Sequence, residues 1–243
     1  MRRTQIVDCR WEIGSPGAGR AAYLAGHIPG ASFLDVDDHL SDLSVPDAGR
    51  HPLPSAERFA AAAGRAGIGD GVVVVAYGNG GGPERLWWLL RHFGHDDCAV
   101  LLGGIEAWRG RLVAGDEEIE PTAFVPHERG DDLVDAQTIA RRLADPSLVL
   151  VDARVASRWR GEPNPIDDPP GRIPGAYNAP WLDEPLPELP DGDLVVYCGS
   201  GVTSCVVLHR AWLAGRDGML YPGSWSEWST RGLPIERGEG HAH

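Results

Sequence analysis

The sequence lacks most of the features that mark secreted, membrane-spanning or metal-binding proteins. Its 243 residues include only four cysteines, at positions 9, 98, 198 and 205, with no Cys-x-x-Cys pair and no metal-ligand spacing. No apolar segment follows Arg2 and Arg3, so a signal peptide is not expected. The longest aliphatic run, Val72 to Ala76, is far too short to span a bilayer. We therefore expect a cytoplasmic protein with reduced thiols, no metal and no membrane contact.

Positive charge is also scarce. The chain has 22 basic and 35 acidic residues, a formal net charge of −13 and a pI near 5.0. Nucleic acids and anionic membranes select for basic surfaces, so neither is an expected partner. There is no dinucleotide-binding glycine fingerprint and no P-loop, and no cofactor is expected.

The chain contains a long internal repeat, which indicates two copies of one domain. Four blocks recur in the same order, and each N-terminal block is given with its C-terminal counterpart: Ile6–Arg10 with Leu150–Arg154, Gly26–Ala31 with Gly171–Ala176, Val74–Gly80 with Val195–Ser200, and Gly103–Trp108 with Gly223–Trp228. A polar stretch rich in acidic residues, proline and glycine, around 115–132, reads as the linker. We expect an N-terminal domain at 1–114 and a C-terminal domain at 133–243.

Local patterns predict strands alternating with helices in both copies. Strands are expected at Gln5–Asp8, Val72–Tyr77 (fully buried), Leu148–Asp152 and Leu194–Tyr197. Helices are expected after caps at Ser55 and Asp135, after Pro83, and from Thr203 to a stop at Gly215. This alternation predicts an α/β fold in which a mostly parallel sheet is flanked by helices on both faces.

Cys198 is the strongest candidate for a reactive residue. It follows the strand Leu194–Tyr197, precedes a helix, and is followed by Gly199 and Gly201. A glycine-rich loop at a helix start can turn its N–H groups inward and bind an anion. Such surroundings lower a cysteine pKa from about 8.5 to roughly 3.5–7.5 and make the thiolate a nucleophile. Ligands of parallel sheets bind at the carboxyl ends of strands, which is where Cys198 is expected.

The two copies differ at this position. The N-terminal copy has Gly78 where the C-terminal copy has Cys198, so the N-terminal domain is expected to be catalytically inactive. Cys9, Cys98 and Cys205 lack the flanking glycines and are interpreted as core residues.

Over nearly its whole length the chain resembles the two-domain rhodanese-like sulfurtransferases, the mercaptopyruvate/thiosulfate sulfurtransferase family. The paired Asp-x-Arg strands, the paired Ile-Pro-Gly-Ala blocks and the Gly223–Trp228 block belong to that pattern. The loop Cys198, Gly199, Ser200, Gly201, Val202, Thr203 is similar to that of the mercaptopyruvate-preferring branch, whereas thiosulfate-preferring members carry basic residues after the cysteine.

The resemblance implies tandem rhodanese domains and transfer of one sulfur atom through a persulfide on Cys198. The partners it implies are a small anionic sulfur donor, 3-mercaptopyruvate or thiosulfate, and a thiol or cyanide acceptor. A thioredoxin-like protein is one candidate acceptor.

The resemblance also implies roles for residues outside the loop. Arg158 occupies the position of the family's substrate-binding arginine, and a guanidinium can bind a carboxylate through two hydrogen bonds. The branch's second arginine is missing from Pro165–Pro169, and Arg172 replaces its usual histidine, so Arg172 is a second candidate. Asp37, His51 and Ser200 match a proposed proton relay.

The sequence leaves three alternative functions to weigh against this one. A cysteine phosphatase needs an arginine after five loop residues, but position 204 is serine, so this class is disfavoured. The second alternative is a non-catalytic rhodanese regulatory module. Gly78 shows that one copy lacks the nucleophile, but the glycines around Cys198 argue against a non-catalytic role for the whole chain. A thiosulfate-preferring enzyme also stays open.

Overall fold

Each half of the chain forms a four-stranded parallel sheet in the computed structural model, which describes residues 3–239. The first sheet has the order β2-β1-β3-β4, from β1 (Arg3–Cys9), β2 (Ser32–Phe33), β3 (Val72–Gly78) and β4 (Cys98–Val100). The second has the order β6-β5-β7-β8, from β5 (Leu148–Asp152), β6 (Tyr177–Asn178), β7 (Asp193–Tyr197) and β8 (Met219–Leu220). The identical order of corresponding strands confirms the repeat and the predicted α/β class.

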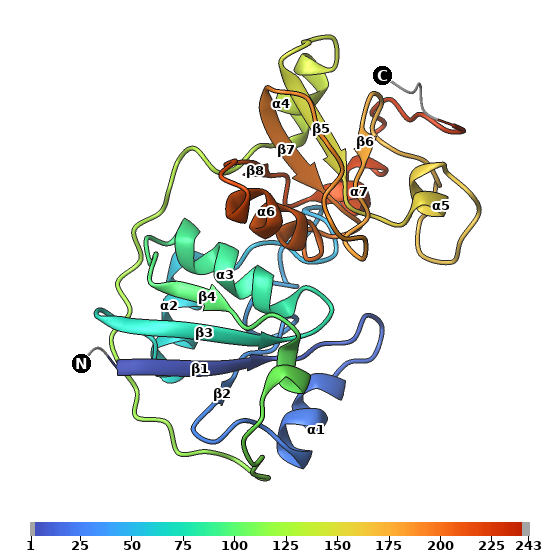
Figure 1. The fold of residues 1–243 in the computed structure, drawn as a ribbon. Helices are drawn as coiled ribbons and strands as arrows, with labels where there is room; N and C mark the ends of the chain where they lie inside the picture. Colours follow the sequence, from blue (N-terminus) through green and yellow to red (C-terminus); the bar gives the residue numbers. More distant parts are fainter. Residues whose placement is uncertain (1–2, 240–243) are drawn as a thin grey trace. The chain divides into compact units, whose positions relative to one another are not determined.

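Helices connect the strands and pack on the sheets (Figure 1). The first half contains α1 (Ala18–Ala25), α2 (Ala56–Arg65), α3 (Gly82–His92) and the 3-10 helix η1 (Gly104–Ala107). The second half contains α4 (Ala136–Arg142), α5 (Ala156–Trp159), α6 (Ser204–Leu213) and α7 (Ser224–Trp228). Among these, α3 contacts β1, β3 and β4, and α6 contacts β7 and β8.

The predicted helix starts are confirmed by their caps. Ser55 Oγ accepts the N–H of Arg58 at 3.2 Å, and Asp135 Oδ1 accepts that of Thr138 at 2.7 Å. A different expectation was wrong. The strand β3 is not buried throughout, because Val73 and Val75 are only partly covered on one of its faces.

By residue contacts the chain divides into two units. The first comprises Met1–Asp42 and Leu53–Arg129, and the second comprises Leu43–Pro52 and Gly130–His243. The segment 43–52 therefore belongs with the C-terminal half, although it precedes α2 in the sequence. The stretch expected to be a linker has no helix or strand over residues 115–129. It is hydrogen-bonded to the rest of the first unit, since His127 donates its N–H to Phe93 O at 2.9 Å.

The paired sequence blocks have a common structural reason. Arg10 forms hydrogen bonds of 2.6–3.1 Å to the Asp8 carboxylate and donates to Gly26 O at 2.7 Å. Arg154 does the same with Asp152 and donates to Gly171 O, also at 2.7 Å. In each unit the arginine thus ties the end of the first strand to the turn that opens the Ile-Pro-Gly-Ala block.

The core of the second unit lies against β5 and β7. It is built from fully buried apolar side chains of the sheet and of α4 and α7, among them Ile139, Leu150, Val195, Trp225 and Trp228. Burial of each such side chain contributes about 1.5–3 kcal/mol. Val195 and Tyr197 of β7 thus pack into this core, and α6 contacts β7 as well, so the loop that follows β7 starts from a packed strand.

Candidate active site

Cys198 directly follows β7, at the carboxyl end of the second sheet, and α6 begins six residues later at Ser204. Its side chain is buried, with 1% of the residue exposed. The intervening loop folds back on the sulfur, and Gly201 donates its backbone N–H to Cys198 Sγ at 3.1 Å. The strand, the loop and the helix start therefore surround one sulfur atom, as the sequence predicts.

Hydrogen bonding makes the Cys198 thiol more acidic. Burial by itself raises the pKa of this cysteine, because it disfavours the charged thiolate. Hydrogen bonds from the Thr203 side chain, the Ser200 backbone, and the side chain and backbone of Ser204 outweigh that effect. The pKa of Cys198 is consequently lower than the ordinary value, which favours a thiolate nucleophile.

Gly201 allows the loop to close. Its φ is +84°, a conformation that other residues rarely adopt, and a Cβ atom at this position would lie 2.4 Å from Pro222 O. A side chain here would push the loop away from Pro222 and move the N–H that binds the sulfur. The glycine is thus required both by its backbone conformation and by the close approach.

The start of α7 holds the other side of the loop. Cys198 donates its N–H to Ser224 Oγ at 3.1 Å, and Trp225 donates its N–H to Cys198 O at 3.0 Å. Ser226 donates its N–H to Gly199 O, also at 3.0 Å. Ser224 has a φ of +52°, which is uncommon for a residue with a side chain. The repeated Gly223–Trp228 block therefore positions Cys198, a role that the sequence analysis did not assign.

Arg158, on α5, lies beside the loop and is held by a buried carboxylate. Its Nε and Nη2 atoms each donate to Asp167 at 2.6 Å, and Arg154 Nη1 donates to the same carboxylate at 3.0 Å. Burial raises the pKa of Asp167, but the hydrogen bond from Arg158 and the charges of the neighbouring arginines outweigh it and lower the pKa. A Cβ atom on Gly199 would lie 2.8 Å from Arg158 Nη2, so the guanidinium faces the residue next to Cys198.

Arg50 is a site residue that the sequence analysis missed. Arg50 lies on the segment 43–52, which belongs to the second unit. A Cβ atom on Gly199 would lie 2.9 Å from Arg50 Nη2. The signal available in the sequence was its position directly before His51, a predicted relay residue. Without the tertiary structure, nothing related position 50 to position 199.

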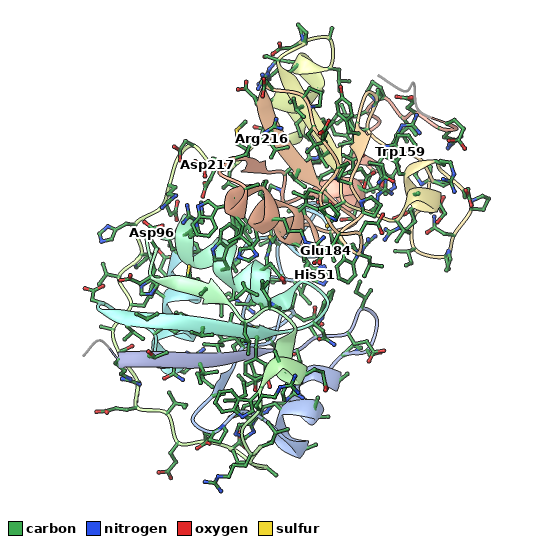
Figure 2. The ribbon with its side chains drawn as sticks, viewed as in Figure 1. His51, Asp96, Trp159, Glu184, Arg216 and Asp217 are labelled. Carbon is green, nitrogen blue, oxygen red and sulfur yellow. The ribbon has the colours of Figure 1, made fainter. Side chains whose placement is uncertain are left out.

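Arg172 has a different environment from the one expected. It is 1% exposed, stacks over the ring of Trp159 at 4.0 Å and pairs with Glu236; Trp159 is labelled in Figure 2. Its Nη1 atom donates to Trp159 O at 3.2 Å and to Gly238 O at 2.7 Å. Within residues 3–239, none of its hydrogen bonds goes to the Cys198–Thr203 loop, so these contacts support a structural role in holding the C-terminal segment.

The three predicted relay residues do not all lie in one unit. His51 and Ser200 belong to the second unit, and Asp37 belongs to the first, where its N–H donates to Asp35 Oδ1 at 2.8 Å. Ser200 is buried in the loop, and its backbone contributes to the lowered pKa of Cys198. The proton relay itself stays a prediction.

Two of the other three cysteines, Cys9 and Cys98, have surroundings that oppose ionisation. Burial, followed by the charge of Asp8, raises the pKa of Cys9 well above the ordinary value. Burial is also the main cause that raises the pKa of Cys98 to about 12. Cys205 is buried in α6 and its Sγ donates to Gly201 O at 3.5 Å. Cys198 thus differs from Cys9 and Cys98 in the direction of its pKa shift.

Residues 3–239 contain neither a metal-binding cluster nor a membrane-spanning helix. In the range 3–239 no group of three or more His, Cys, Asp or Glu side chains is arranged to hold a metal ion. No helix in the same range is long and apolar enough to cross a membrane.

Comparison with known sequences decides the family. The profile of the rhodanese-like domain matches the chain twice, at residues 1–111 and 135–231. The chain belongs to the rhodanese-like sulfurtransferases. Family members with similar sequences include the human 3-mercaptopyruvate sulfurtransferase, which is 36% identical over 98% of this chain and 90% of its own length.

Other relatives in the family carry names that refer to different donors. SseB of Mycobacterium tuberculosis, provisionally named a thiosulfate sulfurtransferase, is 38% identical over 96% of this chain and 90% of its own length. The crystal structure of SseA from Escherichia coli, a 3-mercaptopyruvate enzyme, matches with a TM-score of 0.78 and 32% identity, covering 92% of this chain and 93% of SseA. The relatives thus share the family and differ in the sulfur donor for which they are named.

Proposed function

We propose that the protein transfers a sulfur atom from 3-mercaptopyruvate to a thiol or cyanide acceptor through a persulfide on Cys198. The observation that carries the proposal is the buried Cys198 sulfur, which accepts the N–H of Gly201 and has a lowered pKa. A thiolate is the form that attacks a sulfur atom, and the same N–H can hold the charge of the persulfide product.

The first half-reaction balances without a cofactor. The Cys198 thiolate forms an S–S bond to the sulfur of mercaptopyruvate while the donor's C–S bond breaks. The electron pair of that bond stays on the donor carbon, which takes up the proton lost by the donor thiol and becomes the methyl group of pyruvate. With thiosulfate, the S–S bond of the donor breaks instead and sulfite leaves with the electron pair.

The second half-reaction restores the enzyme. A thiolate or cyanide attacks the outer sulfur of the persulfide and forms a new bond to it, and the Cys198–S bond breaks. Cys198 leaves with the electron pair as a thiolate, ready for another donor. The two half-reactions share one covalent intermediate, so the kinetics should be of the ping-pong type.

Mercaptopyruvate is proposed as the preferred donor because the loop carries no charged side chain at Gly199 or Ser200. A hydroxyl at position 200 can accept or pass the proton that mercaptopyruvate must lose, whereas thiosulfate has no such proton. Arg158 is proposed to bind the donor's anionic group, and the first unit, with Gly78 at the corresponding place, is proposed to be inactive. Thiosulfate stays the alternative donor.

Mass spectrometry can test the intermediate directly. After incubation with donor and no acceptor, we expect one added sulfur atom on the peptide that contains Cys198. Cys198→Ser should fold normally and abolish transfer with both donors. A persulfide on Cys9, Cys98 or Cys205 instead would contradict the assignment, and no persulfide with either donor would favour a non-catalytic regulatory module.

A further inference from the structure

An arginine from the N-terminal half of the sequence lies beside the reactive loop. Arg50 Nη2 and Arg158 Nη2 are 2.9 Å and 2.8 Å from the point where a Cβ atom on Gly199 would be. Because position 199 is glycine, that point is not filled by a side chain. Two guanidinium groups therefore converge on the space next to Cys198.

The segment that carries Arg50 is fixed to the start of α7. Ser226 Oγ accepts the N–H of Arg50 at 3.0 Å, while the N–H of Ser226 donates to Gly199 O at 3.0 Å. Gly49 has a φ of +89°, and a Cβ atom there would lie 2.6 Å from Gly223 O. One serine thus connects the backbone of Arg50 to the reactive loop, and the tight contact at Gly49 keeps the segment in place.

The charges around the loop leave Arg50 without a carboxylate of its own. Arg154 and Arg158 both bind Asp167, whereas the side chain of Arg50 donates only to Ile166 O, at 3.4 Å. Within the described part of the chain, Arg50 forms no ion pair, and it is exposed to solvent. Its guanidinium is therefore available to an incoming anion.

The surroundings also make an anion favourable. Arg50 is exposed as a whole, but the neighbouring loop partly covers its guanidinium, and this partial burial is the main cause that lowers the pKa of Arg50. The nearby charges of Arg158 and Arg154 lower it further, while Asp167 and Cys198 act in the opposite direction. Two guanidiniums directed at one point repel each other until a negative group lies between them. Guanidinium groups suit oxyanions in particular, because their donors match pairs of oxygen atoms.

We propose that Arg50 and Arg158 together bind the anionic group of the sulfur donor, so that the segment 43–52 supplies the second cation of the site. The inference deepens the proposed function and rests on it. With Arg50 as the second cation, the site needs no arginine within Pro165–Pro169. It does not need Arg172 either, which pairs with Glu236. The ligand class is a small oxyanion, a carboxylate or a sulfonate, next to a transferable sulfur.

Binding can be measured separately from transfer in a protein that cannot form the persulfide. Thiosulfate, and in a second series pyruvate, would be titrated calorimetrically into the Cys198→Ser protein. We expect Arg50→Ala in this background to weaken the binding of both by at least about tenfold, as for loss of a charge-assisted hydrogen bond. The affinity of Arg50→Lys for each anion should lie between that of the Cys198→Ser parent and that of Arg50→Ala, because lysine keeps the charge and loses the planar pair of donors.

Arg141→Ala is the matched control. Arg141 is an exposed residue of α4 whose guanidinium donates to Thr138 Oγ1, so its loss removes the same charge from the same unit outside the site. Binding to this variant should equal that of the Cys198→Ser parent. If Arg50→Ala behaves like Arg141→Ala, or if the parent binds neither anion, the assignment of Arg50 is wrong.

A glycine variant tests the shared space without removing a charge. In Gly199→Ala the new Cβ atom meets only the flexible ends of Arg50 and Arg158 among its three nearest contacts, so the fold should be kept while both guanidiniums are displaced. We expect weaker anion binding with an unchanged melting temperature. Unchanged binding would contradict the proposal.

The calorimetric result is independent of whether the protein is a sulfurtransferase. If the unmodified protein forms no persulfide with either donor, the proposed function fails, and the titrations still decide the role of Arg50. If persulfide forms but Arg50→Ala leaves anion binding unchanged, the proposed function stands and this inference fails.

Discussion

Arg158 and Asp167 form an ion pair through two hydrogen bonds of 2.6 Å each, with the carboxylate fully buried. The pair uses Nε and one hydrogen of Nη2, and it fixes the plane of the guanidinium. The remaining N–H groups of Arg158 then face Gly199, next to Cys198. The carboxylate therefore orients Arg158 toward the loop at which the donor is proposed to bind.

Replacing Arg158 should reduce donor use without unfolding the protein. Arg158→Ala should lower kcat/KM by roughly ten- to a hundredfold, equivalent to about 1.5–3 kcal/mol for a charge-assisted hydrogen bond. Asp167 keeps its hydrogen bond to Arg154, so the melting temperature should change little. Arg141→Ala again serves as the control. Equal kcat/KM values for the two variants would show that Arg158 does not bind the donor.

The acidity of Cys198 should depend on Thr203. Its side chain is the largest of the hydrogen-bonding contributions that lower the cysteine pKa, so Thr203→Val should raise that pKa. The thiolate is the major form only above the pKa, so the pH midpoint for alkylation of Cys198 by iodoacetamide should move upward and the rate at neutral pH should fall. Mass spectrometry of the labelled peptides gives the rate at each cysteine.

Thr230→Val is the control for this experiment. Thr230 is exposed and donates its hydroxyl to Glu227 O, so its replacement removes a hydroxyl of the same unit away from the sulfur. Its alkylation midpoint should equal that of the unmodified protein. The same midpoint in Thr203→Val would show that this hydroxyl does not stabilise the thiolate.

Gly201 should be far less tolerant of substitution than another glycine with a similar backbone. Gly201→Ala combines a φ of +84° with a contact of 2.4 Å to Pro222 O, whereas Gly175→Ala has a φ of +75° and nothing within 4 Å. The backbone strain of about 1–3 kcal/mol is common to both, and the clash adds roughly 1–3 kcal/mol at Gly201 alone. Calorimetric melting should show a larger loss for Gly201→Ala; equal losses would mean that the loop relaxes freely.

The donor preference gives a direct comparison of rates. Because the loop is neutral at Gly199 and Ser200, we expect kcat/KM with mercaptopyruvate to exceed that with thiosulfate by at least about tenfold, or about 1.4 kcal/mol. Both donors would be measured with cyanide as acceptor. Equal or better rates with thiosulfate would refute the loop argument and make thiosulfate the donor.

Much of the fold follows from local patterns in the sequence. The apolar run of β7, the caps at Ser55 and Asp135, and the repeat of the Asp-x-Arg blocks depend on neighbours in the chain, and the structure has them where they were expected. Cys198 could also be found locally, because its strand, its glycines and its helix start are consecutive. The full burial expected of β3 was wrong, because how far each face is covered depends on distant residues.

The tertiary structure alone decided which distant residues meet the loop. Arg50 is separated from Gly199 by about 150 residues, and only the docking of the segment 43–52 on Ser226 brings them together. Arg172, a plausible ligand by position, is instead held by Trp159 and Glu236. A sequence motif can indicate the candidate nucleophile Cys198 because its strand, loop and helix start are consecutive in the chain. The cations around it are brought there by long-range packing, which no local pattern records.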